Sequence, residues 1–493
     1  MRNGLKNALL VVATVVLCTA VAEGGVRLLE GGGTSVAARH LDSLPLAPGV
    51  QRAWLMQDPP LPHRKPVPAE WRQLDREIEQ SGVSGPTRRA DAFKAWNSVF
   101  VGDPCKHPYL KDAPGRLFVY DPPDGAPQPP YRFLPDATTP IGLVTNAHGF
   151  RGAPVAVARQ PKTIRIAFLG ASTTVASHHF DWSYPEFVGY WLGEWAKARK
   201  LDLSFEVLNA GREAIRSFDI AAIMRNEVTP LAPDLVVYYE GANQFDLGTI
   251  VPDLPQRPSY VAQTERRQRG WFERRLHDLA YDFALARRVE ALFATREVSG
   301  DGREWPKPDY AVRWPKGLDE KMPDLSRKDL PVHLSEILAD LDRIRLATTE
   351  AGGEMALASY KWLVADGMVL DPERHRAILE YLNIGYAPFR YRDLERLALF
   401  QNRVLEAYAR TNKIDFLDLA RLMPSDPDLF IDAIHGTQEG ERLRGWIMLQ
   451  LLVPVIDRHL ADGTWPRKSF PAAKPPAPYT PRLLTFDCGK AAG

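Results

Sequence analysis

A serine and an Asp–His pair stand where they could together support nucleophilic catalysis. Ser172 follows the apolar run Thr163 to Leu169, at the point where a buried strand would end and the backbone would turn. Asp432 precedes His435 by three residues, so its carboxylate can hold the imidazole Nδ1–H and leave Nε2 free to take a serine proton. Each signal alone has an ordinary alternative: a Gly-x-Ser turn for the serine, and a helix-entry aspartate beside a surface histidine for the pair.

Two further positions could stabilise the negative charge that such an attack creates on a carbonyl oxygen. Gly211 follows a second apolar run, and its missing Cβ leaves the backbone N–H approachable by a substrate oxygen. Asn243 follows a third run, and its side-chain amide can donate to an oxyanion, with Gly241 permitting close approach. Taken singly, Gly211 could be a turn glycine and Asn243 part of an Asx turn. Together, and in this order along the chain, the signals favour acyl transfer by a serine hydrolase.

Such a site needs a scaffold that brings distant segments to one edge, and the apolar pattern predicts one. A helix that begins at about Tyr184 behind an S-x-x-E capping box, Ser183 to Glu186, and a long helix over 391–410 separate short apolar runs. Strands alternating with helices predict a doubly wound, flavodoxin-like, mostly parallel α/β sheet, in which ligands bind beyond the carboxyl ends of the strands. The runs expected to form buried strands cover residues 163–169, 205–208, 235–239, 355–359 and 416–419.

These signals resemble the four sequence blocks of the SGNH (GDSL-like) hydrolases, which contain Ser, Gly, Asn and a final Asp-x-x-His. The stretch NAHGFRG, 146–152, is similar to the lead-in of bacterial membrane-anchored or exported members. The resemblance covers 146 to about 246 and 334 to about 460. The matching blocks are GAST at 170–173, NAG at 209–211, GANQ at 241–244 and DAIH at 432–435.

The resemblance implies a catalytic triad of Ser172, Asp432 and His435. It also implies an oxyanion hole made by the backbone N–H groups of Ser172 and Gly211 and the side chain of Asn243. His435 would take the serine proton as Ser172 attacks an ester carbonyl, and water would later release the acyl group.

This chain departs from the family pattern at two positions. Ala171 stands before the serine where the family motif has Asp, and Gln244 stands where the third block usually ends in Asp. Neither change removes a triad or oxyanion residue, but the support of the loop around Asn243 is expected to differ.

We expect neither a cofactor nor a metal. The chain has no P-loop or dinucleotide fingerprint in the required strand–turn–helix setting. His178 and His179 are adjacent, so their side chains do not converge on one metal, and a solvated or locally hydrogen-bonded pair is the better interpretation. The chain carries 62 basic and 61 acidic residues, and this balance gives no field that would favour nucleic acid.

The first residues predict export. In 1–30, positive charges precede an apolar run from Ala8 to Ala22, which orients the rest of the chain outward, to the periplasm or another extracytoplasmic compartment. The run is short for a bilayer span, which needs about 20 apolar residues. Ala20 to Ala22 offers a small-x-small cleavage site. A cleaved signal peptide and an uncleaved inner-membrane anchor are both open, and Leu28 and Leu29 favour the anchor.

The length of 493 residues fits one catalytic domain with additions. We expect an accessory Pro-rich region at 31–145, a hydrolase domain at 146–462 with an insertion at 246–331, and a Pro-rich tail at 463–493. Two short helices are predicted in the accessory region, one with Trp71, Leu74 and Ile78 on one face, the other with Phe93, Trp96 and Phe100.

The insertion holds a basic amphipathic segment around Trp271, with Arg266, Arg267, Arg269, Arg274 and Arg275. It could be a lid, a membrane contact, a glycan-binding face or simply a solvated helix packed on the domain. Cys105 and Cys488 could form a disulfide in an oxidising compartment, tying the tail to the N-terminal region, or could be unrelated thiols.

Together these expectations describe an exported serine esterase that hydrolyses acyl, mainly O-acetyl, esters on envelope or extracellular glycans. Its expected partners are an acylated carbohydrate and, if 1–30 is uncleaved, the inner membrane. The same groups would serve an O-acyltransferase if a sugar hydroxyl replaced water, and lipid esters and thioesters are also open as substrates. A non-catalytic glycan-binding or scaffold protein that kept the fold is the alternative from another class.

Overall fold

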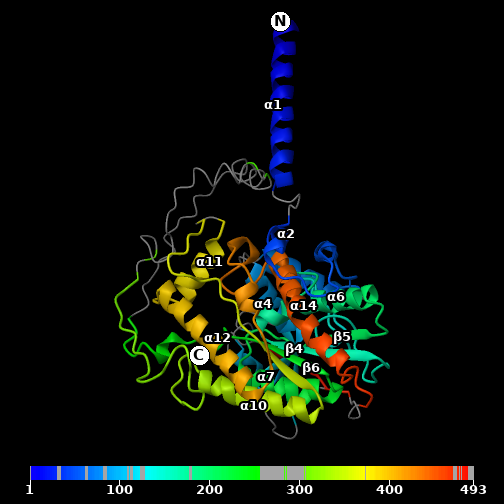
Figure 1. Ribbon diagram of the computed structural model, residues 1–493, viewed down its shortest axis with the longest axis vertical. Coiled ribbons are helices and arrows are strands. Elements are labelled where there is room, and N and C mark those ends of the chain that lie inside the picture. Colours follow the sequence, from blue (N-terminus) through cyan, green and yellow to red (C-terminus); the bar gives the residue numbers. More distant parts are fainter. Residues whose placement is uncertain are drawn as a thin grey trace.

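The computed structural model places a five-stranded parallel sheet at the centre of the chain (Figure 1). Neighbouring strands pair in parallel throughout, in the order β5-β4-β6-β7-β8. The strands are β4 (Thr163–Gly170), β5 (Ser204–Asn209), β6 (Leu235–Tyr239), β7 (Glu354–Ala358) and β8 (Asp415–Leu417). The structure describes residues 2–29, 35–61, 65–80, 86–107, 110, 115–122, 128–176, 180–255, 283, 285, 305, 307–371, 374–469, 475–476, 478 and 480–486.

Helices cover both faces of this sheet, as a doubly wound fold requires. α6 (Tyr184–Ala198) packs against α14 (Gln438–Ala461), and α7 (Ser217–Ile223) packs against α10 (Leu334–Glu350). Figure 1 shows β4 and β6 between α14 on one side and α7 and α10 on the other. The expected α/β fold class is confirmed. The remaining helices of this part are α5 (Ser172–Val175), α11 (Arg376–Glu380), α12 (Tyr391–Asn412) and α13 (Leu419–Leu422).

The strands lie where the apolar runs predicted them, because a central parallel strand is buried on both faces and must be apolar throughout. Every residue of β4 is buried. α6 begins at Tyr184 behind the capping box that Ser183 forms with Glu186, as predicted. The last strand differs: it ends at Leu417, where its pairing with β7 ends, and Leu419 begins α13.

The N-terminal region contains a second sheet that the sequence did not predict. It has four strands in the order β3-β1-β2-β9. β1 (Ser98–Val101) and β3 (Tyr131–Phe133) are too short to show an alternating pattern, and β9 (Arg482–Phe486) comes from the stretch expected to be a tail. β9 pairs antiparallel with β2 (Gly115–Tyr120), so the end of the chain adds a strand to the N-terminal sheet.

Of the two helices predicted in this region, one is as expected and the other is shorter. α3 (Ala69–Gln80) carries Trp71, Leu74 and Ile78. α4 (Pro86–Asn97) carries Phe93 and Trp96 but ends before Phe100, so that part of the prediction is wrong. Phe100 lies in β1, where it pairs with Val119 and Tyr131, and its ring is fully buried.

α1 (Arg2–Leu29) projects from the rest of the chain as a separate helix (Figure 1). The side chains of residues 11–20 are exposed to solvent. Among the helices that the structure describes, none is both long enough and apolar enough to cross a membrane. A short helix, α2 (Val36–Arg39), comes next in the chain.

Candidate active site

Ser172 is the first residue of α5 and follows β4 after a single intervening residue, Ala171. The carbonyl oxygen of Ala171 accepts hydrogen bonds from the backbone N–H groups of Thr174 and Val175, both at 3.0 Å. These bonds begin the helix through the backbone alone, so a buried alanine suffices where the family motif has Asp. The first N–H groups of a helix have no partner within it, and that of Ser172 is one of them.

The structure brings Ser172, His435 and Asp432 into one hydrogen-bonded chain. The Nε2 atom of His435 lies 2.8 Å from the Oγ atom of Ser172, and its Nδ1 atom lies 2.7 Å from Oδ2 of Asp432. The other carboxylate oxygen, Oδ1, accepts the backbone N–H groups of Ile434 and His435 at 2.9 and 2.8 Å. One aspartate therefore fixes both the tautomer of the imidazole and the loop that carries it.

Burial is the largest single influence on the pKa of each member of this pair, but the charges and hydrogen bonds around each group together outweigh it. Burial opposes the charged form of Asp432, but the charge and hydrogen bonds of His435 lower the pKa of the carboxyl group below its usual value. Burial likewise favours a neutral imidazole, but Asp432 raises the pKa of His435 above its usual value. The imidazole is therefore a stronger base than an isolated histidine.

Gly211 lies beside the same turn and leaves no room for a side chain. A Cβ atom there would lie 2.6 Å from the backbone nitrogen of Val175, so only glycine permits this approach to α5. Its N–H donates to Oδ1 of Asn209 at 3.1 Å. A substrate oxygen would have to share this hydrogen.

Asn243 lies at the carboxyl end of β6, with its amide nitrogen 2.7 Å from the carbonyl oxygen of Ile215, to which it donates. A side-chain amide has two N–H donors, so this bond orients the group and leaves the second donor for a ligand. Gly241 packs tightly behind the loop, since a Cβ atom there would lie 2.4 Å from Nε2 of Gln401.

Gln244, the second departure from the family pattern, supports the Asn243 loop in its own way. Its side-chain oxygen accepts the backbone N–H of Ser217, the first residue of α7, at 2.8 Å. The loop after β6 is thereby joined to the start of α7.

Glu240 is a functional candidate that the sequence analysis missed. One of its carboxylate oxygens accepts the backbone N–H groups of Ala242 and Asn243, both at 2.8 Å. Burial raises its pKa, while these backbone hydrogen bonds and the charge of His435 act in the opposite direction. Its place directly before the GANQ block was a usable signal, because an acidic residue at the end of a buried strand needs a partner.

Two buried ion pairs near the histidine were also missed. Arg444 pairs with Glu441 inside α14 and donates to the carbonyl oxygen of Ile434 at 3.3 Å, next to His435. Lys94, from α4, lies 3.2 Å from Glu213, and both side chains are at least nine-tenths buried. No short-range pattern could have joined Lys94 to Glu213, because the two residues are 119 positions apart in the sequence.

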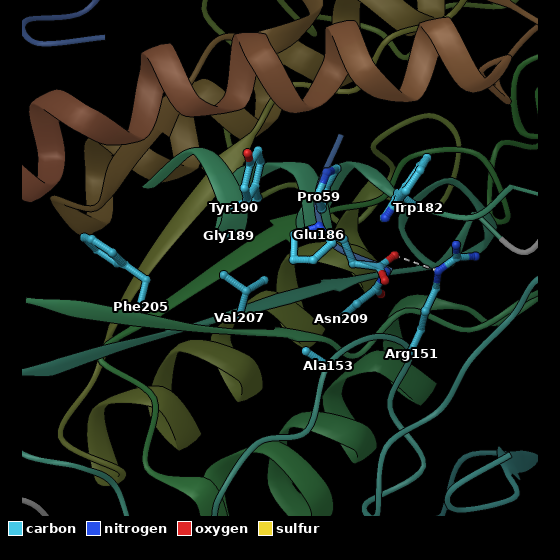
Figure 2. Close-up of a pocket in the computed structure, with 11 residues that line it drawn as sticks. Pro59, Arg151, Ala153, Trp182, Glu186, Gly189, Tyr190, Phe205, Val207 and Asn209 are labelled. Atoms are coloured by element: carbon cyan, nitrogen blue, oxygen red, sulfur yellow. Dashed lines mark hydrogen bonds and ion pairs between the residues drawn. The ribbon is translucent and has the colours of Figure 1, made fainter. Parts of the chain in front are cut away.

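A polar network binds the end of α5, the short helix that begins at Ser172, and Figure 2 shows three of its side chains, Arg151, Glu186 and Asn209. Arg151 donates to Oε2 of Glu186 at 2.9 Å and to the carbonyl oxygens of Val175 and Ala176 at 3.1 and 2.7 Å. Asn209 donates to the carbonyl oxygen of Thr174 at 2.8 Å. The network thereby donates hydrogen bonds to carbonyl groups at the end of α5. The side chains of Arg151, Glu186 and Asn209 also line a cavity of about 210 Å³ between α6 and β5.

Some predicted features lie outside the described residues: His178, His179, the five arginines of the basic segment, and Cys488. Cys105 is disulfide-bonded, while Cys18 is a free, exposed thiol. Pairing of Cys105 with Cys488 stays a prediction. In the part of the chain that the structure describes, no group of three or more His, Cys, Asp or Glu residues is arranged to hold a metal ion.

No family model matches the chain, and no curated protein matches its sequence. Solved structures do. A GDSL-like lipase from Bacteroides thetaiotaomicron VPI-5482 is 14% identical with a TM-score of 0.29, covering 62% of this chain and 92% of that chain. A catalytic mutant of an acetylxylan esterase from Geobacillus stearothermophilus is 14% identical with a TM-score of 0.31, covering 59% and 94%. A lipase/acylhydrolase from Enterococcus faecalis is 13% identical with a TM-score of 0.31, covering 59% and 96%.

Proposed function

We propose that this chain is a serine esterase that hydrolyses acyl esters, mainly O-acetyl esters of envelope or extracellular glycans. The observation that carries the proposal is the hydrogen-bonded chain from Asp432 through His435 to Ser172, with separations of 2.7 and 2.8 Å. That arrangement is the one a serine nucleophile needs, because a serine hydroxyl attacks a carbonyl only when a neighbouring base takes its proton.

In the proposed mechanism, Ser172 attacks the ester carbonyl while His435 takes its proton. The oxyanion receives hydrogen bonds from the N–H of Ser172, from the second N–H of the Asn243 amide, and from the shared N–H of Gly211. His435 then returns the proton to the leaving alcohol, and the acyl group stays on Ser172. Water, deprotonated by the same imidazole, releases the acid and restores the serine.

An O-acyltransferase would use the same residues, with a sugar hydroxyl taking the place of water in the second step. The two activities differ in the acceptor alone, so they are separated by product analysis with and without an added glycan. We place the reaction in the periplasm or another extracytoplasmic compartment on the charge pattern of residues 1–30, with the inner membrane as a partner if that segment is uncleaved.

The test is turnover of p-nitrophenyl acetate by the full chain beside the Ser172→Ala and His435→Ala variants. We expect both substitutions to reduce turnover to the residual level that the oxyanion hole alone supports. The variants should keep the wild-type circular dichroism spectrum. A folded wild-type chain without turnover of this ester or of acetylated glycans would contradict the proposal and favour a binding or scaffold protein.

A further inference from the structure

A cavity of about 540 Å³ opens beside Asn243. Its size falls within the range of about 300–1,000 Å³ that is usual for small-molecule sites. Four segments of the chain build it: the start of α7, the loop after β6, the start of α10, and the stretch that follows α11. The α10 and β6 segments flank the predicted insertion at 246–331, so this cavity lies where the chain adds to its central sheet.

The cavity is connected to the reaction centre electrostatically as well as by position. Tyr381 and Tyr386 line it, and the negative charges of Glu240 and Asp432 reach both rings. Burial, with these charges, raises the pKa of Tyr386 to about 12. Because Asn243, the proposed oxyanion donor, lines the cavity, a group bound here lies beside the ester carbonyl.

One wall of the cavity is aromatic and held in place by ring contacts. The Tyr381 and Tyr386 rings lie 5.5 Å apart. Phe245 packs 6.3 Å from Tyr386 and 4.6 Å from the ring of Trp362. Phe389 completes this wall. The rings form a fixed apolar surface whose shape is set before any ligand binds.

Other side chains that line the cavity are charged. His333 lies between two carboxylates, with Nε2 3.6 Å from Asp246 and Nδ1 3.3 Å from Glu336. The side chains of Asp246 and Glu336 are 59% and 67% exposed, so both can bind a ligand without losing a buried partner. Arg216, which is also exposed, adds a guanidinium group with five N–H donors.

This combination selects among the groups that an ester substrate could place in the cavity. A lipid chain filling the cavity would remove water from these charged side chains without replacing their hydrogen bonds, which is costly. A pyranose ring has an apolar face of C–H groups that fits the aromatic wall. Its hydroxyls can donate to Asp246 and Glu336 and accept from Arg216.

We infer that this cavity binds the pyranose unit that carries the ester, with the ring against Tyr386 and its hydroxyls on Asp246 and Glu336. The inference rests on the proposed function, of which it names the substrate side. Asp246, Glu336 and Tyr386 are then specificity-determining residues, and sugar esters are preferred over lipid esters.

The test compares the release of acetate from O-acetylated xylo-, gluco- and manno-oligosaccharides with turnover of p-nitrophenyl acetate and p-nitrophenyl octanoate. For Tyr386→Ala and for Asp246→Asn, we expect the ratio of kcat/KM for the best acetylated sugar to that for p-nitrophenyl acetate to fall at least tenfold. The loss should appear mainly in KM. Tyr386→Phe, which keeps the ring, should retain most of the ratio. Ile384→Ala is the matched control, because Ile384 is 49% exposed and does not line the cavity.

The outcomes separate this inference from the proposed function. If the wild type turns over p-nitrophenyl acetate but prefers the octanoate ester to every acetylated sugar, the pyranose site is wrong and the esterase stands. Unchanged ratios in both cavity variants would overturn it equally. Wild-type turnover of p-nitrophenyl acetate by Ser172→Ala would instead overturn the proposed function itself.

Discussion

At the scale of single residues, the proposed mechanism gives one carboxylate control over the proton taken from Ser172. Asp432 uses one oxygen on the imidazole and the other on the two N–H groups of its own loop. Because its charge raises the pKa of His435, the imidazole becomes protonated, and unable to act as a base, at a higher pH than an ordinary histidine.

This pKa shift gives a prediction for the pH profile. The acid limb of kcat/KM should have its midpoint above 6.5, the usual pKa of histidine. Asp432→Asn should lower that midpoint and reduce kcat by about 10⁴-fold, the effect seen when this partner is neutralised in serine proteases. The measurement is p-nitrophenyl acetate turnover between pH 5 and 9. Acid limbs that coincide for the wild type and Asp432→Asn would contradict the prediction.

The same shifts act on stability with opposite signs. The raised pKa of His435 means that its contribution is complete below the unfolded pKa of about 6.5 and is lost as pH rises through the folded value. The lowered pKa of Asp432 means that its contribution is present above about 3.9 and is lost as pH falls through the folded value. Above about 6.5, as pH rises through the folded pKa of His435, the proposed site gains activity while it loses this contribution to stability.

Asn243 provides a prediction for the oxyanion site. Its amide is oriented by the carbonyl oxygen of Ile215, and its backbone is held by Glu240. Asn243→Ala should lower kcat for p-nitrophenyl acetate by about 10²–10³-fold with little change in KM, because the donor acts on charge that develops in the transition state. Glu240→Gln, which keeps an acceptor for the loop, is the milder comparison. A rise in KM with an unchanged kcat for Asn243→Ala would show that the amide binds the ground state instead.

At the scale of the elements, the His435 loop depends on an ion pair inside α14. Arg444 and Glu441 are both almost completely buried, and Arg444 donates to the carbonyl oxygen of Ile434. A buried pair contributes little net stability, but removing one partner leaves an uncompensated charge in the interior.

Arg444→Met should therefore lower the free energy of unfolding by about 3–5 kcal/mol and reduce turnover by displacing His435. Adding Glu441→Leu should restore much of the stability, because both charges are then gone. Urea unfolding of the two variants measures this, and equal stability of the single and double variants would show that the charges are not coupled.

The sequence predicts elements well where burial requires a continuous apolar run or a short motif marks the start of a helix. The fully buried β4, the capping box at Ser183 and the five-stranded sheet all follow from short-range signals. The three- and four-residue steps from Phe93 to Trp96 and Phe100 predict that Phe100 lies on the same helix. Such a spacing also arises by chance where a strand follows a helix, as it does here. β1 and β3 acquire their structure from pairing with distant segments, which local periodicity does not record.

The candidate site shows the same division. Ser172, Asp432 and His435 could be found because each stands in a short motif that its chemistry requires. The Lys94–Glu213 pair could not, since only the tertiary fold brings the accessory region to the histidine.

At the scale of the whole molecule, specific contacts pack the N-terminal region against α6, a helix that covers the central sheet. The indole nitrogens of Trp191 and Trp195, in α6, donate to the carbonyl oxygens of Trp54 and Pro48, both at 2.9 Å. β9 joins the other end of the chain to the N-terminal sheet. The accessory region is thereby part of one structure with the site.

The Lys94–Glu213 pair makes this connection measurable. Glu213 raises the pKa of His435, and Lys94 offsets part of its negative charge. Lys94→Met should therefore move the acid limb of kcat/KM to higher pH and lower stability, while Lys94→Arg should keep the wild-type profile. An acid limb unchanged in Lys94→Met, in a protein shown to be folded, would separate the accessory region from the chemistry.

The central claim is that Ser172 is a nucleophile activated by His435. Covalent labelling of the full chain by a fluorophosphonate, read by peptide mass spectrometry, tests it most directly, because the reagent needs an activated serine and no particular substrate. We predict one labelled peptide, carrying the adduct on Ser172, with labelling lost in Ser172→Ala and strongly slowed in His435→Ala. A folded wild-type chain that stays unlabelled, or carries the adduct on another serine, would contradict the account.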